Sequence, residues 1–519
     1  MDANLLYQFD GNMPALCEGI EGSFRCEWGP PKRWRVRYLD SFDWRLYRKG
    51  LSLRHEAAFS DKGGAEIVLA AIAGPARQSL RVRKVPAFAT QLRKSSLRTQ
   101  LETLLGERRL LVRASLDLSG LEGRILNGDD KTVAHVLIAE GATVGVGQQS
   151  PLPLPPLLEL RPVKGYRQSL LALQEHIGSL PGIQSQGGSL FEFALDVAGG
   201  RAGDNPSAVT LCLESGTDLG PGTATILRSQ LKVFQANLEG VKRDWDAEFL
   251  HDFRVATRRV RSLLSQFKDV LPAAGFKRLR KHLKWVGRVT GPMRDIDVYL
   301  SRMATYDQIF PPDVLVGLKP LQEYLLHRRE EEHALLVGAL RSQRYGRLIA
   351  AWQESARTAS RVCLGLSVET IAAARILEVY QRILAVGAEI GDRFEPVRLH
   401  GLRIECKELR YLLEFFRSLF APQVLDRLID ELKGLQDVLG EINDLQVQQE
   451  DLQRYAKAMV AEDDRQTDTL LNMGRLLGHF ETSQVRLFPR FRKRLRSFSR
   501  RSVQKALIDG LSKYSGDSS

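Results

Sequence analysis

A twelve-residue phrase occurs twice in this chain, and the two copies are separated by a constant offset of 149 positions. Residues 250–261 read LHDFRVATRRVR, and residues 399–410 read LHGLRIECKELR. In both copies the apolar positions are three and four residues apart, which places them on one face of a helix. The same offset relates Lys284 to Lys433 and Asp295 to Asp444. A duplicated helical module is therefore the simplest explanation.

Residues typical of helix ends delimit both copies. Asp246 precedes the first helix, Pro396 stands in the first turn of the second, and Pro272 and Pro422 follow their ends. Glycines recur at 287–291 and at 438–440, and we expect the following helix to break at each place. These signals predict an all-α domain over residues 219–505, with repeat one at about 223–360 and repeat two at about 370–505.

Each repeat carries four cationic positions with the spacing 3-4-3. At about 100° per residue they lie within roughly 80° of one another, beside the apolar stripe and not opposite it. Like charges at these spacings repel one another, so an anion is expected to balance them. All four positions keep their type in both copies, whereas Arg259, off the stripe, corresponds to Glu408. A solvated basic face would vary at both places. We therefore favour an anion-binding site formed by His251, Arg254, Arg258 and Arg261 together with His400, Arg403, Lys407 and Arg410.

The overall composition is compatible with such a site. The formal net charge of +13 favours a polyanionic partner, such as nucleic acid or a phosphorylated polymer. The five cysteines are scattered, without a C-x-x-C pair, which argues against a disulfide framework and against a zinc site. No apolar run reaches the length of a membrane span, and the N-terminus lacks the features of a secretory signal. We expect a cytoplasmic protein without a membrane partner.

The first 200 residues differ in hydrophobic pattern from the rest of the chain. They are rich in β-type runs broken by glycine and proline: RWRVRYLD, EIVLAAIAG, KTVAHVLIAEGATVGV and SLFEFALDV. The proline-rich stretch PLPLPPLLELRP (151–162) interrupts these runs. Residues 201–218 have the composition of a linker, and residues 506–519 are expected to form a tail. The chain is thus predicted to consist of an α+β, β-rich domain over residues 1–200 followed by the all-α domain.

The repeated phrases carry a family resemblance. HDFRVATRRVRSLL and HGLRIECKELRYLLEFF, followed by GPMRDIDV and LGEINDLQV, resemble the CHAD family over about residues 219–505. The resemblance implies two repeated helical bundles and a basic central channel that binds inorganic polyphosphate. It assigns ligand contacts to the two cationic stripes and to Lys284 and Lys433. No cofactor is implied beyond divalent cations that accompany polyphosphate. Polyphosphate granules are a candidate location that the sequence leaves open.

Three further residues belong to the same motifs. Copy two has Asn443 where copy one has Arg294. Asp295 and Asp444 are expected to cap the helices that follow. We also expect His251 and His400 to link binding to proton uptake, because a free imidazole has a pKa near 6.5 and a bound polyanion favours its charged form.

The N-terminal half resembles CYTH domains, which are β-rich tunnels for triphosphates, in YLDSFDWRLYRKGLSLRHE (38–56) and LLELRPVKGY (157–166). That resemblance implies metal-dependent chemistry on an opening E-x-E-x-K strand. Residues 1–27 hold Glu18, Glu21 and Glu27, which lack that spacing, and Glu56 and Glu159 are the other candidates for an acidic set. We predict a degenerate CYTH-like domain without catalytic residues. Hydrolysis of triphosphate or polyphosphate by this domain is the alternative.

Nucleic-acid binding by the basic surface is a third possibility. The segment RLFPRFRKRLRSFSRR (486–501) interleaves Phe488, Phe491 and Phe498 with cations, a pattern that suits single-stranded nucleic acid. We expect these phenylalanines to face the core of the last helices instead. Nucleic acid is therefore the less favoured partner.

Overall fold

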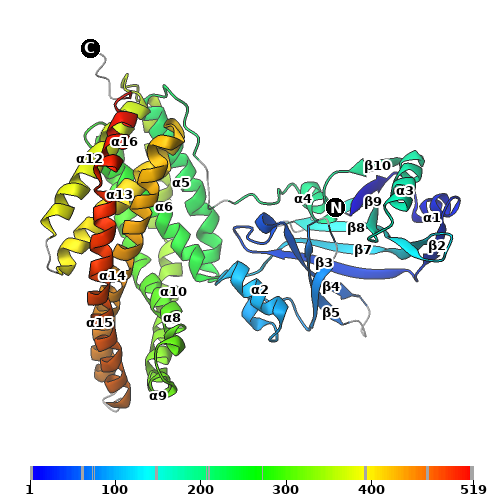
Figure 1. Ribbon diagram of the computed structural model, residues 1–519, viewed down its shortest axis with the longest axis horizontal. Helices are drawn as coiled ribbons and strands as arrows, with labels where there is room; N and C mark the ends of the chain where they lie inside the picture. Colours follow the sequence, from blue (N-terminus) through cyan, green and yellow to red (C-terminus); the bar gives the residue numbers. More distant parts are fainter. Residues whose placement is uncertain are drawn as a thin grey trace. The chain divides into compact units, whose positions relative to one another are not determined.

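The computed structural model describes residues 4–59, 64–72, 74, 76–145, 150–205, 207, 211–271, 273–390, 394–462 and 467–514. The chain divides into two compact units, Met1–Pro206 and Ser207–Ser519. The first unit is built around an antiparallel β-sheet, and the second is helical throughout its described residues (Figure 1). This division confirms the predicted fold class.

The N-terminal unit contains a ten-stranded sheet in the order β10-β1-β9-β8-β7-β3-β4-β5-β6, with β2 paired to β7. All of its described pairings are antiparallel. The strands are β1 (Leu5–Phe9), β2 (Arg25–Trp28), β3 (Lys32–Asp40), β4 (Leu51–Ala58), β5 (Ala65–Ala71), β6 (Ala76–Val82), β7 (Leu111–Leu126), β8 (Thr132–Gly145), β9 (Leu152–Pro162) and β10 (Ile183–Gln186).

The proline-rich stretch does not interrupt the sheet but forms strand β9. Its C-terminal part, Leu157–Leu160, pairs with β8 on one side and with β1 on the other. Its prolines Pro153, Pro155 and Pro156 lie beyond the end of β1, where β9 has only β8 as a described neighbour. A strand edge tolerates proline because no ladder hydrogen bond is lost there.

Four helices accompany the sheet: α1 (Met13–Glu21), α2 (Ser96–Leu105), α3 (Arg167–Ser179) and α4 (Leu190–Val197). The β-type interpretation of SLFEFALDV was wrong, because these residues form α4. Ser189 and Glu192 make a capping box, in which each side chain bonds the backbone N–H of the other residue. This S-x-x-E signal was readable in the sequence.

Helix α4 packs its apolar side chains on one face of the sheet. Phe191 stacks on Tyr38 with ring centroids 4.4 Å apart. The same buried cluster includes Leu6 of β1, Leu118 of β7 and Leu157 of β9. The part of this face that α4 covers is therefore filled by apolar groups.

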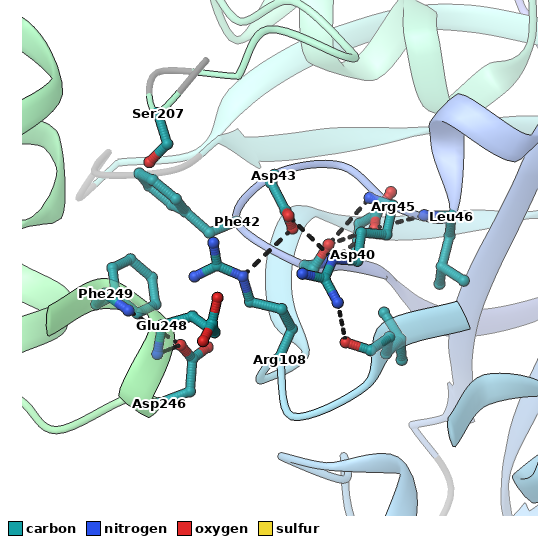
Figure 2. Close-up of polar contacts among 12 residues, drawn as sticks. Asp40, Phe42, Asp43, Arg45, Leu46, Arg108, Ser207, Asp246, Glu248 and Phe249 are labelled. Atoms are coloured by element: carbon teal, nitrogen blue, oxygen red, sulfur yellow. Dashed lines mark hydrogen bonds and ion pairs between the residues drawn. The ribbon is translucent and has the colours of Figure 1, made fainter. Parts of the chain in front are cut away.

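A polar cluster shapes the loop that follows β3. The buried carboxylate of Asp40 accepts a hydrogen bond from the amide of Leu46 at 3.0 Å (Figure 2). It also accepts one from the amide of Tyr47, at 2.9 Å. Asp43 forms an ion pair with Arg108, whose side chain is 3% exposed. These contacts order the segment between β3 and the 3-10 helix η1 (Tyr47–Lys49).

The C-terminal unit is composed of long helices. They are α5 (Leu219–Lys242), α6 (Ala247–Gln266), α7 (Ala273–Val289), α8 (Gly291–Met303), α9 (Pro312–Gly317), α10 (Lys319–Arg341), α11 (Gln343–Arg361), α12 (Val368–Glu389), α13 (Pro396–Phe416), α14 (Pro422–Glu462), α15 (Thr467–Phe498) and α16 (Arg501–Leu511). Figure 1 draws the first repeat in green and the second in yellow to red. Helix α16 extends into the segment that the sequence suggested as a tail.

Equivalent positions of the two repeats contact each other at two places. Asp218 and Ser367 form an isolated antiparallel bridge, and the rings of Phe267 and Phe416 lie 5.8 Å apart. Each pair is separated by the repeat offset of 149 positions. Contacts between a position and its own equivalent occur around a two-fold axis. The two repeats are therefore related by an approximate two-fold axis that passes between α6 and α13.

The predicted helix starts agree with the structure. Asp246 is the N-cap of α6 and accepts hydrogen bonds from the amides of Glu248 and Phe249 (Figure 2). Pro396 is the first residue of α13. Pro422 begins α14, and Pro272 lies outside the described residues.

The predicted helix breaks agree in the first repeat only. Helices α7 and α8 separate at Thr290, and Pro292, in the first turn of α8, has no backbone N–H to continue the preceding helix. In the second repeat α14 runs unbroken through Gly440, so the expected break there was wrong. Copy two has Glu441 in place of the proline. A single glycine costs a helix only about 1 kcal/mol, which packing readily offsets.

The expected caps at Asp295 and Asp444 were also wrong. Asp295 lies inside α8, and Asp444 lies in the middle of α14. Asp444 instead forms ion pairs with Arg302 and, at 3.7 Å, with Arg403. The carboxylate therefore serves a tertiary contact, which local spacing could not reveal.

Candidate anion-binding site

A cavity of about 370 Å³ lies in the helical unit, lined mainly by residues of α6, α13 and α14, with Val233 of α5 and Ser207. Five of the ten predicted ligand residues line it: His251 and Arg258 from the first repeat, and Arg403, Lys407 and Arg410 from the second. The structure thus brings the two copies of the cationic stripe to one place. The meeting follows from the approximate two-fold axis, which sets α6 against α13.

Polar contacts hold α6 and α13 together beside the cavity. Arg259 donates to the Glu414 carboxylate at 2.6 and 3.0 Å, and Gln266 donates to Glu408 at 2.6 Å. The sequence indicated only that Arg259 and Glu408 lie off the cationic stripe, where the charge changes sign between the copies. In the structure both side chains are half-buried and bond across the repeats. Arg259 pairs with Glu414, and Glu408 accepts from Gln266, so the opposite charges at these equivalent positions serve two different contacts.

Lys407 lies among the cations of the cavity. Burial lowers the pKa of its ammonium to about 7, and the positive charges of Arg403, Arg258 and Arg410 act in the same direction. Asp444 opposes this shift. Within the described part of the chain, Lys407 has no hydrogen bond or ion pair. An anion in the cavity would supply the charge that this ammonium lacks.

The two arginines beside Lys407 are only partly satisfied. Burial lowers the pKa of Arg403. Its one ion pair within the described ranges, with Asp444, is long at 3.7 Å. Arg258 donates to the hydroxyl of Tyr411, a neutral partner. The cavity lining contains five Lys/Arg side chains against three Asp/Glu. Its electrostatic balance is therefore positive where α6 faces α13.

Arg254 does not line this cavity. Its guanidinium donates to the Gly287 carbonyl at 3.3 Å and to the Thr290 hydroxyl at 2.8 Å, at the C-terminal end of α7. A cation at that end balances the helix dipole and the last carbonyl groups. Burial lowers the pKa of Arg254. These contacts give Arg254 a structural task, and its predicted ligand role stays a prediction.

The two histidines occupy different surroundings. His251 lines the cavity, and its Nδ1 lies 3.1 Å from Arg294 Nη2. A guanidinium can only donate, so this contact needs a lone pair on Nδ1 and leaves the proton on Nε2. His400 is exposed, pairs with Asn443 at 2.8 Å, and lines a separate cavity of about 330 Å³. The first repeat has Arg294 where the second has Asn443. The two histidines therefore have different partners, and they line different cavities.

Three other predicted residues lie away from the cavity lining. Lys433 lines an adjoining cavity of about 550 Å³, which shares Arg259 and Arg410 with the first. Arg261 and Lys284 are exposed and line neither cavity. Sequence reasoning missed a group of lining residues that carries no repeated pattern, namely Asp252, Arg259, Tyr411, Glu414, Gln436 and Asp437.

In the N-terminal unit, Glu56 and Glu159 share a smaller cavity of about 240 Å³. Glu159 binds Arg161 at 2.8 Å and accepts from Asn4 at 2.8 Å. Glu56 forms an ion pair with Arg54. Both candidate carboxylates are therefore engaged with neighbouring side chains. Strand β1, the first strand of the described chain, contains no glutamate.

No group of three or more His, Cys, Asp and Glu side chains in the described part of the chain is arranged to hold a metal ion. No helix in the same ranges combines the length and apolar character that crossing a membrane requires.

A known domain family matches part of the helical unit. Residues 225–453 match the family model of the CHAD domain. Two uncharacterized proteins of Mycobacterium tuberculosis, from strains CDC 1551 and H37Rv, are 29% identical to this chain over 220 residues. That alignment spans 40% of this chain and 40% of each relative, so the chain spans less than half the length of these relatives.

Solved structures were found as well. The crystal structure of the CHAD domain from the plant Ricinus communis is 26% identical, covers 59% of this chain and 95% of its own, and has a TM-score of 0.47. PptA from Streptomyces chartreusis is 17% identical, covers 54% of this chain and 99% of its own, and has a TM-score of 0.43.

The helical unit of this protein contains a CHAD domain, over residues 225–453. The CHAD family is associated with polyphosphate binding. The N-terminal unit is β-rich, and its resemblance to CYTH domains stays a prediction.

Proposed function

We propose that this protein binds inorganic polyphosphate in the cavity between α6 and α13. The observation that carries the proposal is the meeting of Arg258, Arg403 and Lys407, which come from two repeats and lack full compensation by carboxylates. Charge-assisted hydrogen bonds from guanidinium and ammonium groups are the contacts that phosphate oxygens favour. His251 and Arg410 complete the proposed first contacts.

The lining favours a bare phosphate chain over nucleic acid. Specific recognition of single-stranded nucleic acid uses exposed aromatic side chains on which bases stack. Tyr411 is the one Phe, Tyr or Trp residue among those that line this cavity, and its side chain is buried with its hydroxyl on Arg258. Phe488, Phe491 and Phe498 of α15 are buried, as expected from the sequence. Neither group offers a stacking surface.

We expect polyphosphate to bind more tightly than DNA or RNA of similar total charge at matched salt. Both affinities should fall as salt rises, since each polyanion releases counterions on binding. Isothermal titration calorimetry with the full chain measures the comparison. Equal or tighter binding of nucleic acid would sink the proposal. A phosphate-release assay on the same samples, with magnesium or manganese, tests the hydrolase alternative.

Polyphosphate affinity should fall as pH rises through about 7. Below that pH the Lys407 ammonium is charged in the empty cavity, because its pKa lies near 7 instead of at its ordinary value. A bound polyanion stabilises the ammonium, so binding above pH 7 requires proton uptake, with a limiting slope of about tenfold per pH unit for one proton. Titrating affinity against pH for the wild type and Lys407→Arg measures this effect, and the arginine variant should show a flat profile.

The matched control is the pair His251→Gln and His400→Gln. If Lys407 is the titrating group, this double variant keeps the wild-type profile. A flat profile for the histidine pair, with an unchanged profile for Lys407→Arg, would instead assign the proton linkage to the histidines, as the sequence alone suggested.

A further inference from the structure

Helix α7 carries a second row of cations, outside the cavity. Lys277, Lys281, Lys284 and Arg288 follow one another at spacings of four, three and four residues, and all four side chains are exposed. At about 100° per residue they share one face, over roughly 16 Å of helix. The opposite face packs into the core through Leu279, Leu283 and Val286. We refer to these four residues as the α7 row.

The α7 row has no acidic partner among the residues that the structure describes. No ion pair joins any of its four cations to a carboxylate within the described ranges, and helix α7 itself contains no Asp or Glu. More positive charge lies beside the α7 row. Burial lowers the pKa of His282, and the positive charges of Arg344, Arg278, Lys281 and Arg347 lie near enough to lower this pKa further. The field over this face is therefore positive and uncompensated.

The internal repeat shows that this row is not part of the common module. The offset of 149 relates Lys277 to Asp426, Lys281 to Asp430 and Arg288 to Asp437. Three cations of the first repeat are thus carboxylates in the second. Lys284 alone keeps its charge, as Lys433. A duplicated fold tolerates either sign at these positions, so packing alone does not require the lysines and arginine on α7.

Arg261 connects the cavity to the α7 row. It lies one turn beyond Arg258 on α6, is exposed, and has no ion pair in the described structure. A methyl group placed on Gly287 of α7 would lie 3.5 Å from Arg261 Nη1, so the guanidinium rests against α7. Lys284 and Arg288 flank Gly287 along the helix. Cations therefore follow one another from the cavity onto the outer face of α7.

We propose that the α7 row is a second contact surface for a linear phosphate polymer, and that a chain longer than the cavity leaves it over Arg261 on the side of the first repeat. This inference rests on the proposed function. On the second repeat the equivalent positions carry Asp426, Asp430 and Asp437, and Asp426 forms an ion pair with Arg417 at 2.8 Å. The second repeat therefore lacks an equivalent row of cations, although the cavity itself is built from both repeats.

The test compares a short and a long ligand. Tripolyphosphate is short enough to occupy the cavity alone, whereas long-chain polyphosphate can reach the α7 row as well. The variant combines Lys277→Asp, Lys281→Asp and Arg288→Asp, which places on α7 the residues that the second repeat carries. A control with the same charge change combines Arg486→Asp, Lys493→Asp and Arg496→Asp, which are exposed on α15.

We expect the α7 variant to bind tripolyphosphate like the wild type and to bind the long chain about tenfold to a hundredfold more weakly. The salt dependence of long-chain binding should also weaken, by about two in the log–log slope, since each lost phosphate contact removes ~0.7 for a single-stranded polyanion. The α15 control should keep both affinities. A variant with glutamine at the same three α7 positions gives the same test if the aspartates disturb folding.

Two outcomes would overturn the inference. If the α7 variant binds the long chain as tightly as the wild type, the α7 row is not a contact surface. If the α7 and α15 variants lose equal affinity for the long chain, the effect comes from the net charge of the protein and not from the α7 row. Failure of the proposed function has a different signature. In that case the wild type does not bind tripolyphosphate, or binding survives replacement of Arg403 and Lys407.

Discussion

Replacing Arg403 and Lys407 together with alanine is expected to weaken polyphosphate binding by roughly two to four orders of magnitude. Each side chain can offer a charge-assisted hydrogen bond, which contributes about 1.5–3 kcal/mol, and about 1.4 kcal/mol corresponds to a factor of ten. These two residues and Arg258 face one another, so the loss falls at the most positive part of the cavity. Calorimetric titration with tripolyphosphate measures it.

The same substitution should leave folding intact. Burial and neighbouring cations lower the pKa values of both residues, so their charged forms are disfavoured by the empty protein. Removing them relieves repulsion and leaves no buried carboxylate without a partner, because Asp444 keeps Arg302. Arg486→Ala with Lys493→Ala, on the exposed face of α15, is the matched control. Retained affinity in the Arg403 and Lys407 variant, together with normal stability, would contradict the proposed site.

Replacing Arg329 with methionine is expected to lower the free energy of unfolding by about 3–5 kcal/mol, the usual cost of leaving a buried charge unpaired. Arg329 of α10 donates to Asp297 of α8 at 2.6 Å and to both oxygens of Asp244 at 2.5 and 2.7 Å. The Asp297 side chain is only 2% exposed. Hydrogen bonding to Asp244 raises the pKa of Arg329. Without the guanidinium, two carboxylates would remain close together and partly desolvated.

The neighbouring Arg328 provides the control. Its side chain is 41% exposed and pairs with Glu331 and Glu332 on the same helix. Exposed pairs of this kind contribute about 0–1 kcal/mol, so Arg328→Met should change stability little. Urea denaturation of both variants measures the difference. Adding Asp297→Asn to Arg329→Met should recover part of the loss, and similar small effects of both methionine substitutions would show that the buried cluster is not stabilising.

Local signals predicted the helical unit well. The offset of 149 positions identified the repeat, and the spacing of apolar residues placed the helices that carry both histidine phrases. Asp246 caps α6 as expected, because an N-cap depends only on a side chain and the amides two and three residues later. The buried phenylalanines of α15 were expected for the same reason of periodicity.

Predictions that needed tertiary context were wrong. Gly440 was expected to break α14, but packing along a helix of 41 residues outweighs the small preference of one glycine. SLFEFALDV was interpreted as strand because its apolar residues have high β-propensity, although its capping box and its packing on the sheet make it α4. Asp444 was taken for a cap, yet it pairs with Arg302, which lies 142 residues away in sequence.

Sequence spacing was enough to place each cationic stripe on one edge of its helix, because that geometry depends only on the period of the helix. Spacing could not decide which cations of the two stripes meet. Arg258, Arg403 and Lys407 share a cavity, while Arg254 binds the end of α7 and Arg261 and Lys284 face solvent. It also could not reveal that Arg259 and Glu408 bond across the repeats. Proximity and burial are set by the packing of helices far apart in sequence, and they decide which charges stay uncompensated and therefore which residues can bind an anion.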